Sequence, residues 1–237
     1  MAAEKKEKIA IFGFHDSIVG QFLAFSDVIS KYEIAYFLAC REIPDLNIEE
    51  EHRTRPNDKT EFVVNKQIFG KPVYHDKDFT SRLIADNINK VFVLEEDIET
   101  RETIFNELSA HRIEPQSYIH PNVFLGGKNF IGKGVIIFPN CNIGYKTDIK
   151  QGTIMQPFTL IYHHNLIGQF CNIAPRVTTG GFTEISDKVT INLGANIINR
   201  IKVGSRCVIG AGSLVLKDCG PDSVYVGSPA KLLKKQH

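Results

Sequence analysis

Large aliphatic side chains recur at every sixth position from Ile119 to Val215, and no insertion interrupts the series. Of the 17 positions reached in steps of six, 15 carry Ile, Leu or Val, and the exceptions are Met155 and Thr179. Ordinary composition would place these three residue types at about a quarter of randomly chosen positions. Neither the period of an α-helix nor the alternation of a strand produces this pattern. A strict period of six predicts a β-helix.

The residues between these aliphatic anchors support the same architecture. Four positions after most anchors the side chain is small or β-branched, and glycine often follows the anchor directly. We expect the anchor to point inward, the small residue to pack beside it, and the glycine to relieve a tight corner. Three such sides close a coil of about 18 residues, so residues 119–215 make about five coils. The alternative is a sandwich of short strands, but sandwich strands vary in length and spacing.

Before residue 112 the hydrophobic pattern changes to that of an α/β domain. An apolar run at 8–14 predicts a buried strand, helical spacing over 18–31 predicts a helix, and a run at 33–40 predicts a second strand. A strand, a helix and a strand within about 30 residues predict a βαβ unit with parallel pairing.

The following segments complete this domain. The charged, proline-containing stretch 41–61 predicts a loop. Helical spacing then follows a candidate N-cap at Asp78, so we expect a helix over 78–88. A strand is predicted at 90–95 and an amphipathic helix at 98–110.

These patterns place a domain boundary near residue 112. Residues 1–112 are expected to form a small α/β domain, and 113–237 the β-helix. A β-helix leaves an open edge on its last coil, which the tail at 223–235 is expected to cap.

Composition narrows the functional classes. The chain has 237 residues, a net charge of +1, 43% hydrophobic and 23% charged residues, which is ordinary for a soluble globular protein. No basic excess points to nucleic acid, no apolar run approaches the length of a membrane span, and no signal peptide is recognised. Three of the five cysteines, Cys141, Cys171 and Cys207, occupy small inward positions and are expected to be buried and reduced. The expected compartment is the cytoplasm.

One corner of the repeat carries candidate chemistry. His163 and His164 follow the anchor Ile161, and corner side chains face outward. One coil later, 18 residues on, the stacked residues are Thr179, Gly180 and Gly181, so the corner above His163 has no side chain. A base beside a free backbone N–H suits acyl transfer, because one group removes a proton and the other stabilises the oxyanion. Alternatively, the two glycines only permit a tight corner.

The whole pattern resembles the bacterial hexapeptide-repeat acyltransferases that modify amino or hydroxyl groups of nucleotide-linked sugars. The likeness lies in the strand–helix–strand start, the linker IHPNVFLGG, the six-residue repeat with its histidine corner, and the ending VYVGSPAK. The resemblance implies a Rossmann-like N-terminal domain followed by a left-handed parallel β-helix. It also implies a homotrimer, acetyl-CoA as the acyl donor, no metal, and an active site at the subunit interface.

The resemblance also implies roles for particular residues. The family's catalytic histidine falls on His163 and its backbone oxyanion donor on Gly181. In the family an acidic residue usually follows the catalytic histidine, whereas here it is His164, which we count with the catalytic residues. A neutral imidazole can orient its neighbour but supplies no negative charge, so His163 is expected to be a weaker base than in relatives.

Cofactor contacts are carried over in the same way. The family's CoA-contacting positions fall on Asn172, Leu193 and Ala211. Leu193 and Ala211 are 18 residues apart and should therefore stack in one column, as an extended pantetheine arm requires.

The nucleotide loop of the family is altered in this chain. Its G-x-x-G-H-G pattern corresponds to a segment in which only the first glycine remains; the expected substrate-binding residues are Gly13, Phe14, His15, Asp16 and Ser17. Glu96 stands where relatives carry glycine, and a carboxylate there would repel a pyrophosphate. We therefore expect a sugar-nucleotide pocket of unusual form.

Three functions remain open from the sequence. The favoured one is N-acetylation of an amino group on a nucleotide-linked deoxy sugar for surface glycan biosynthesis, with O-acetylation as an alternative. The second is a zinc enzyme on the same fold, but its candidate ligands His120, His163 and His164 are poorly placed, because His120 lies over two coils away. The third is a non-catalytic trimeric scaffold.

Overall fold

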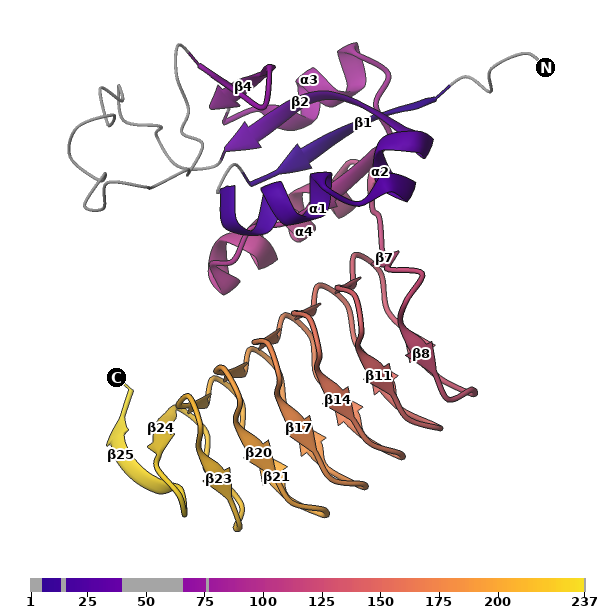
Figure 1. The fold of residues 1–237 in the computed structure, drawn as a ribbon. Helices are drawn as coiled ribbons and strands as arrows, with labels where there is room; N and C mark the ends of the chain where they lie inside the picture. Colours follow the sequence, from indigo (N-terminus) through magenta and orange to yellow (C-terminus); the bar gives the residue numbers. More distant parts are fainter. Residues whose placement is uncertain (1–5, 14–15, 40–65, 76, 237) are drawn as a thin grey trace, which may run out of the picture. The chain divides into compact units, whose positions relative to one another are not determined.

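A computed structural model of the chain describes residues 6–13, 16–39, 66–75 and 77–236. It divides into two compact units, Met1–Pro115 and Gln116–His237 (Figure 1). The predicted loop at 41–61 lies outside the described residues, as do Phe14, His15 and Cys40.

The first unit is an α/β domain built on a six-stranded sheet in the order β3-β4-β2-β1-β5-β6. All neighbouring strands run parallel except β3 and β4, which form an antiparallel hairpin. Its strands are β1 (Glu7–Phe12), β2 (Tyr32–Ala39), β3 (Gln67–Ile68), β4 (Lys71–His75), β5 (Lys90–Val93) and β6 (Glu114–Pro115). Its helical segments are η1 (Asp16–Gly20), α1 (Gln21–Leu23), α2 (Ser26–Lys31), α3 (Phe79–Ala85) and α4 (Ile98–Ala110). Within the described residues, no helix has the length and apolarity that a bilayer span requires.

Most elements expected in this unit are present. β1 and β2 pair in parallel, which confirms the βαβ unit. α3 begins after Asp78, whose carboxylate accepts a hydrogen bond from the Ser81 N–H, as expected of an N-cap. α4 covers the predicted 98–110.

The single helix expected over 18–31 is wrong. The chain instead forms a π-helical turn, the short α1, and a separate α2. Phe25 separates them with an extended backbone, φ −76° and ψ 120°. Ser26 and Asp27 then open α2, and both residue types favour a helix N-terminus. Of the apolar residues at helical spacing, Ile18, Phe22 and Val28 are buried, but Ile29 is 49% exposed, so the spacing predicted the buried face only in part and did not predict the break.

The β3–β4 hairpin was missed by the sequence reasoning. Its two turn residues, Phe69 and Gly70, both have positive φ, 50° and 68°, as a tight hairpin turn requires. Phenylalanine rarely adopts this conformation, so the sequence lacked the usual Asn-Gly signal.

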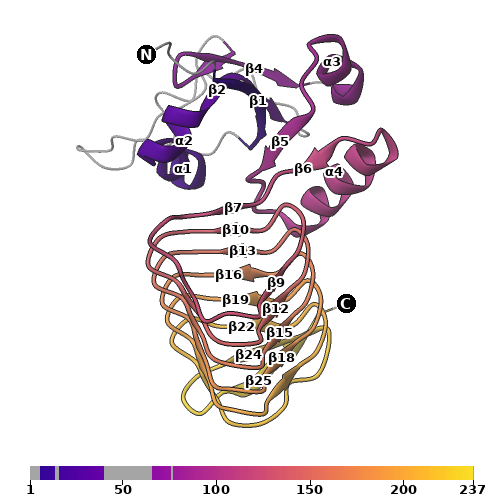
Figure 2. The same cartoon turned by 90° about the vertical axis from the view of Figure 1, so that its right-hand side faces the viewer.

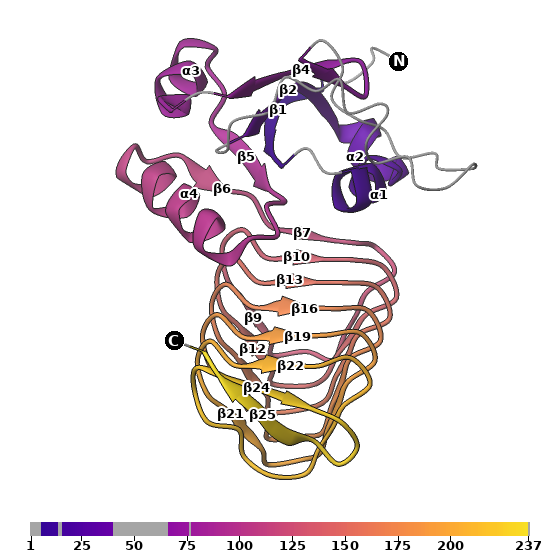
Figure 3. The same cartoon turned by 90° about the vertical axis from the view of Figure 1, so that its left-hand side faces the viewer.

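The second unit is a parallel β-helix with three sides of two-residue strands (Figures 2 and 3). The first side contains β7 (Tyr118–Ile119), β10 (Ile136–Ile137), β13 (Ile154–Met155), β16 (Asn172–Ile173), β19 (Thr190–Ile191) and β22 (Val208–Ile209). The second side contains β8 (Phe124–Leu125), β11 (Asn142–Ile143), β14 (Leu160–Ile161), β17 (Thr178–Thr179), β20 (Asn196–Ile197) and β23 (Leu214–Val215). The third side contains β9 (Phe130–Ile131), β12 (Asp148–Ile149), β15 (Leu166–Ile167), β18 (Glu184–Ile185) and β21 (Lys202–Val203).

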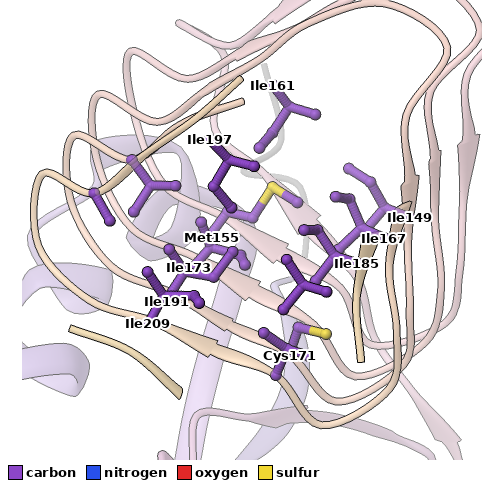
Figure 4. Close-up of a cluster of buried hydrophobic side chains, with 14 of the residues drawn as sticks. Ile149, Met155, Ile161, Ile167, Cys171, Ile173, Ile185, Ile191, Ile197 and Ile209 are labelled. Atoms are coloured by element: carbon purple, nitrogen blue, oxygen red, sulfur yellow. The ribbon is translucent and has the colours of Figure 1, made fainter. Parts of the chain in front are cut away.

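The strand register confirms the 18-residue coil. Ile143 pairs with Ile161 and Ile161 with Thr179, and the same offset holds along all three sides. Every anchor from Ile137 to Val215 is buried, and together they fill the inside of the coil (Figure 4), whereas Leu125, on the first coil, is 42% exposed. Burying these aliphatic groups is the main force that holds the coils together.

The role expected of the glycines after the anchors is wrong. After each anchor from Leu125 to Ile209, the left-handed backbone of the corner belongs to the third residue, for example Lys146, His164 and Phe182 with φ of 56°, 57° and 58°. The glycine directly after the anchor serves a different need, because the next coil passes close above it. A Cβ on Gly144 would lie 2.6 Å from the His163 backbone nitrogen. Glycine is therefore required there by close approach of two coils.

The tail extends the first side beyond the last coil. β24 (Ser223–Val226) pairs in parallel with β22, and β25 (Lys231–Lys235) returns antiparallel to β24. This hairpin covers the open edge of that side, as the sequence predicted. Cys141, Cys171 and Cys207 are buried, as predicted.

Candidate active site

Two stacked turns bring the candidate catalytic residues together. The histidine turn, residues 162–164, connects β14 to β15, and the glycine turn, residues 180–182, connects β17 to β18. Because Ile161 pairs with Thr179, the glycine turn lies one coil beyond the histidine turn, as the stacking argument predicted. The Phe182 N–H also donates to the His163 carbonyl at 3.0 Å, which is one contact between the two turns.

The imidazole of His163 lies directly against the Gly181 backbone. A Cβ placed on Gly181 would sit 2.6 Å from His163 Cε1 and 3.0 Å from both ring nitrogens. No hydrogen bond between described residues uses the Gly181 N–H. A base and an available backbone donor therefore share one half-buried corner.

The two histidines hydrogen-bond to each other. His163 Nδ1 and His164 Nδ1 are 3.1 Å apart. Such a contact holds one hydrogen, so one ring donates and the other accepts. The arrangement occupies Nδ1 of both rings and leaves Nε2 of His163 for chemistry.

Aromatic and cationic side chains surround the pair. The His164 ring stacks on Phe182, with centroids 4.7 Å apart and planes at 14°, and the Arg200 guanidinium lies 4.9 Å from the centroid of the Phe182 ring. Tyr145 meets His164 edge-on at 5.8 Å, and Tyr162 lies 4.9 Å from His163. Stacking on Phe182 holds the His164 ring in the orientation that points Nδ1 toward His163.

A buried polar cluster lies beneath the histidine turn. The Asn165 side-chain amide donates to the Tyr162 carbonyl at 3.0 Å and to the Thr179 hydroxyl at 2.8 Å. Its Oδ1 accepts from the Thr183 N–H. The sequence reasoning noted the polar anchor at Thr179 but missed this cluster. The signal was available, because Asn165 stands 14 residues before the one polar anchor of the series.

The expected CoA-contacting residues lie at other places on the coil. Asn172 is on the first side, in β16, and Leu193 and Ala211 are in the turns between the first and second sides. The Gly212 N–H donates to the Leu193 carbonyl at 2.8 Å, so these turns stack in one column as predicted. The structure does not bring this column to the corner of His163 within one chain.

The expected substrate loop is described in part. Gly13 directly follows β1 and has φ 105°, and its N–H donates to the Leu38 carbonyl at 3.1 Å. A Cβ there would lie 3.2 Å from the Leu94 backbone, so glycine is needed where three parallel strands end. Asp16 begins η1 and Ser17 is exposed within it.

The acidic residues after β5 differ in burial. Glu96, which the sequence singled out, is exposed, whereas Glu95 is buried and accepts a hydrogen bond from the Asp97 N–H at 3.0 Å. The fully buried Arg101 of α4 donates to the Glu95 carbonyl. This contact holds the segment between β5 and α4 in place. Within the described part of the chain, no three acidic, histidine or cysteine side chains group as metal ligands would.

Comparisons with known proteins bear on this site. No protein-family model matches the chain. A serine acetyltransferase of Synechococcus elongatus is 32% identical over 108 residues, which are 42% of this chain and 43% of that protein. GDP-perosamine N-acetyltransferase of Escherichia coli O157:H7 is 26% identical over 179 residues, covering 73% of this chain and 75% of that one. The chain is similar to hexapeptide-repeat acetyltransferases.

Solved structures show the same fold. PerB from Caulobacter crescentus, solved with CoA and GDP-perosamine, has a TM-score of 0.78 and 18% identity, over 96% of this chain and 97% of that one. This likeness confirms the left-handed β-helix. The resemblance inferred from the sequence is also confirmed. The chain spans about half the length of the serine acetyltransferase it matches.

Proposed function

We propose that this chain is a cytoplasmic, acetyl-CoA-dependent N-acetyltransferase. Its acceptor is an amino group on a nucleotide-linked deoxy sugar that is used in surface glycan biosynthesis. The observation that carries the proposal is the His163 imidazole lying against the Gly181 backbone. Similarity to a GDP-perosamine N-acetyltransferase, and to a structure with CoA and GDP-perosamine, supports the choice of donor and acceptor.

In this proposal His163 is the general base. Its Nε2 takes a proton from the amine as the amine nitrogen attacks the thioester carbonyl carbon. The carbonyl oxygen becomes an oxyanion, which the Gly181 N–H stabilises. The carbon–sulfur bond then breaks, CoA leaves as a thiolate that takes up a proton, and the new amide remains on the sugar.

His164 sets the tautomer of the base. For His163 Nε2 to accept a proton, Nδ1 of His163 must carry the hydrogen and donate it to His164 Nδ1, 3.1 Å away. His164 thus replaces the acidic residue usual in the family as a hydrogen-bond acceptor, although it brings no negative charge. An amine whose pKa lies near neutrality needs only a modest base to lose its proton. Turnover is therefore compatible with His164 in place of the acidic residue.

A site shared between copies of the chain explains the position of the CoA column. Leu193 and Ala211 lie at a different corner from His163, and both are exposed. In a homotrimer, the column of one subunit would face the histidine turn of its neighbour. Residues 1–112, as a Rossmann-like substrate-binding domain, would hold the nucleotide near Gly13 and Ser17.

The test is turnover by the full chain with acetyl-CoA and a panel of nucleotide-linked amino sugars, read as release of the CoA thiol. We expect His163→Ala to lower kcat by about 10²- to 10⁴-fold, the usual contribution of a general base. The matched control is His111→Ala, because His111 is an exposed residue that follows α4 in the other unit. Acetyl-CoA binding, measured by calorimetry, should persist in both variants.

Three outcomes would contradict the proposal. Full turnover by the His163→Ala variant would show that His163 is not the general base. Transfer to hydroxyl acceptors in place of amines would identify an O-acetyltransferase. Absence of acetyl-CoA binding by the unmodified chain would instead identify a scaffold.

A further inference from the structure

The series of inward-pointing anchors has one polar member, Thr179, and it directly precedes the glycine turn. Thr179 is buried, with 1% of its surface exposed, at a position that carries an aliphatic side chain or Met155 in every other hexad. Its hydroxyl accepts a hydrogen bond from Asn165 Nδ2 at 2.8 Å, and Asn165 is 2% exposed. The two side chains therefore satisfy each other inside an otherwise apolar core.

Hydrogen bonds connect this pair to the peptide group before His163 and to the peptide group that carries the Gly181 N–H. Asn165 Nδ2 also donates to the Tyr162 carbonyl, which belongs to the peptide bond that carries His163. Asn165 Oδ1 accepts from the Thr183 N–H, and the Thr183 hydroxyl donates at 3.0 Å to the Gly180 carbonyl. That carbonyl belongs to the peptide group whose N–H is Gly181.

The coil itself does not require such a pair. At an equivalent position of another corner, the Thr153 hydroxyl donates to the Gly168 carbonyl at 2.8 Å and accepts from the Cys171 N–H at 3.1 Å. Its neighbouring anchor is the aliphatic Ile167. A threonine with an aliphatic anchor thus joins two coils without an asparagine. Replacing two buried polar partners by apolar groups of like shape is close to neutral for stability.

We propose that Asn165, oriented by Thr179, is a positioning residue that fixes the distance between the His163 base and the Gly181 oxyanion donor. The proposal rests on the acyl-transfer function proposed above. The histidine turn and the glycine turn belong to different coils, so their separation depends on contacts that cross from one coil to the next. Asn165 supplies such contacts from the buried side, where water cannot compete for them.

A fixed distance between His163 Nε2 and the Gly181 N–H matters for the chemical step. The amine proton must reach His163 Nε2 while the oxyanion forms at the Gly181 N–H, and both events occur in one transition state. A displacement of about 1 Å between them lowers the rate by about 10²-fold. Acetyl-CoA affinity should not depend on Asn165, because Asn165 is buried beneath the histidine turn and is not one of the expected CoA-contacting residues.

The test separates positioning from stability. The double variant Asn165→Thr/Thr179→Val gives this corner the arrangement of the Thr153 corner, so its thermal midpoint should stay within a few degrees of the parent. We expect its kcat to fall roughly 10- to 100-fold with the KM for acetyl-CoA unchanged, because threonine joins the two coils but does not replace the bond from Asn165 to the Tyr162 carbonyl. Two single variants, Thr179→Val without the hydroxyl and Thr179→Ser with it, provide a second comparison in which only the first should lose turnover.

The matched control is Thr159→Val. The Thr159 hydroxyl donates to the Gln156 and Ala174 carbonyls, the same offsets that Thr183 uses, but at a corner without the histidines. Its kcat should match the parent.

Two outcomes would overturn the inference: a double variant with parental kcat, or an equal loss of kcat in Thr159→Val. If the double variant does not fold, parental kcat in Thr179→Val overturns it as well. Failure of the proposed function looks different. In that case the parent chain shows no turnover, or His163→Ala retains it, before Asn165 is changed.

Discussion

Replacing Gly181 by alanine tests the geometry of the active corner most directly. The new Cβ would lie 2.6 Å from His163 Cε1, whereas ordinary contacts begin near 3.4 Å. Since the φ of Gly181 is outside the left-handed region, alanine fits the backbone and only the imidazole must move. The ring must withdraw by about 0.8 Å, and a shift of about 1 Å costs roughly 10²-fold in rate.

The expected result is a fall in kcat on the order of 10²-fold, or about 2.7 kcal/mol of transition-state stabilisation. The free energy of unfolding should change little, because the His163 ring is partly exposed and can turn outward. Steady-state kinetics with the best acceptor and urea unfolding would measure the two quantities.

Gly220→Ala is the matched control. Gly220 also lacks a left-handed backbone, and the nearest atoms to its added Cβ are 3.8 Å away, so neither stability nor kcat should change. A kcat of Gly181→Ala within about twofold of the parent would contradict this geometry, because a displaced base cannot support parental turnover. A loss of kcat in Gly220→Ala as large as that in Gly181→Ala would also refute it.

Two further predictions concern His164 and a buried thiol. His164→Phe, which removes the acceptor of the His163 Nδ1 hydrogen, should lower kcat at least tenfold, while His164→Asp should keep or raise it; equal rates would contradict the orienting role. Phenylalanine is tolerated in this backbone, since Phe182 adopts φ 58° one coil away. Burial raises the pKa of the Cys141 thiol to about 11, so its contribution to stability is complete below about pH 9 and lost as the pH rises through 11. Urea unfolding should therefore show an alkaline loss of roughly 2–3 kcal/mol that Cys141→Ala lacks, and parallel curves for both proteins would contradict it.

The period of six allowed the β-helix and its stacking to be predicted. An inward anchor every six residues buries a core only if three sides close a coil, so the 18-residue register followed from the sequence. That register placed Gly181 beside His163 without any knowledge of side-chain contacts. It also placed Leu193 and Ala211 in one column, although at a different corner from His163.

Other features depend on contacts that no local pattern records. The break at Phe25 and the turn of the β3–β4 hairpin at Phe69 fall on a residue type that carries no turn signal, so propensity could not place them. The glycine after each anchor looked like a corner residue, but the coil above it imposes its small size.

The six-residue period was enough to predict the β-helix and the residues that meet one coil apart, because a repeated local period fixes a regular register. How those residues contact each other could be seen only in the folded chain. The fold turned the Nδ1 atoms of His163 and His164 toward one another, and it joined Asn165 to Thr179 beneath them. These orientations depend on side-chain rotamers and on hydrogen bonds across coils, which are settled only when the whole corner is packed.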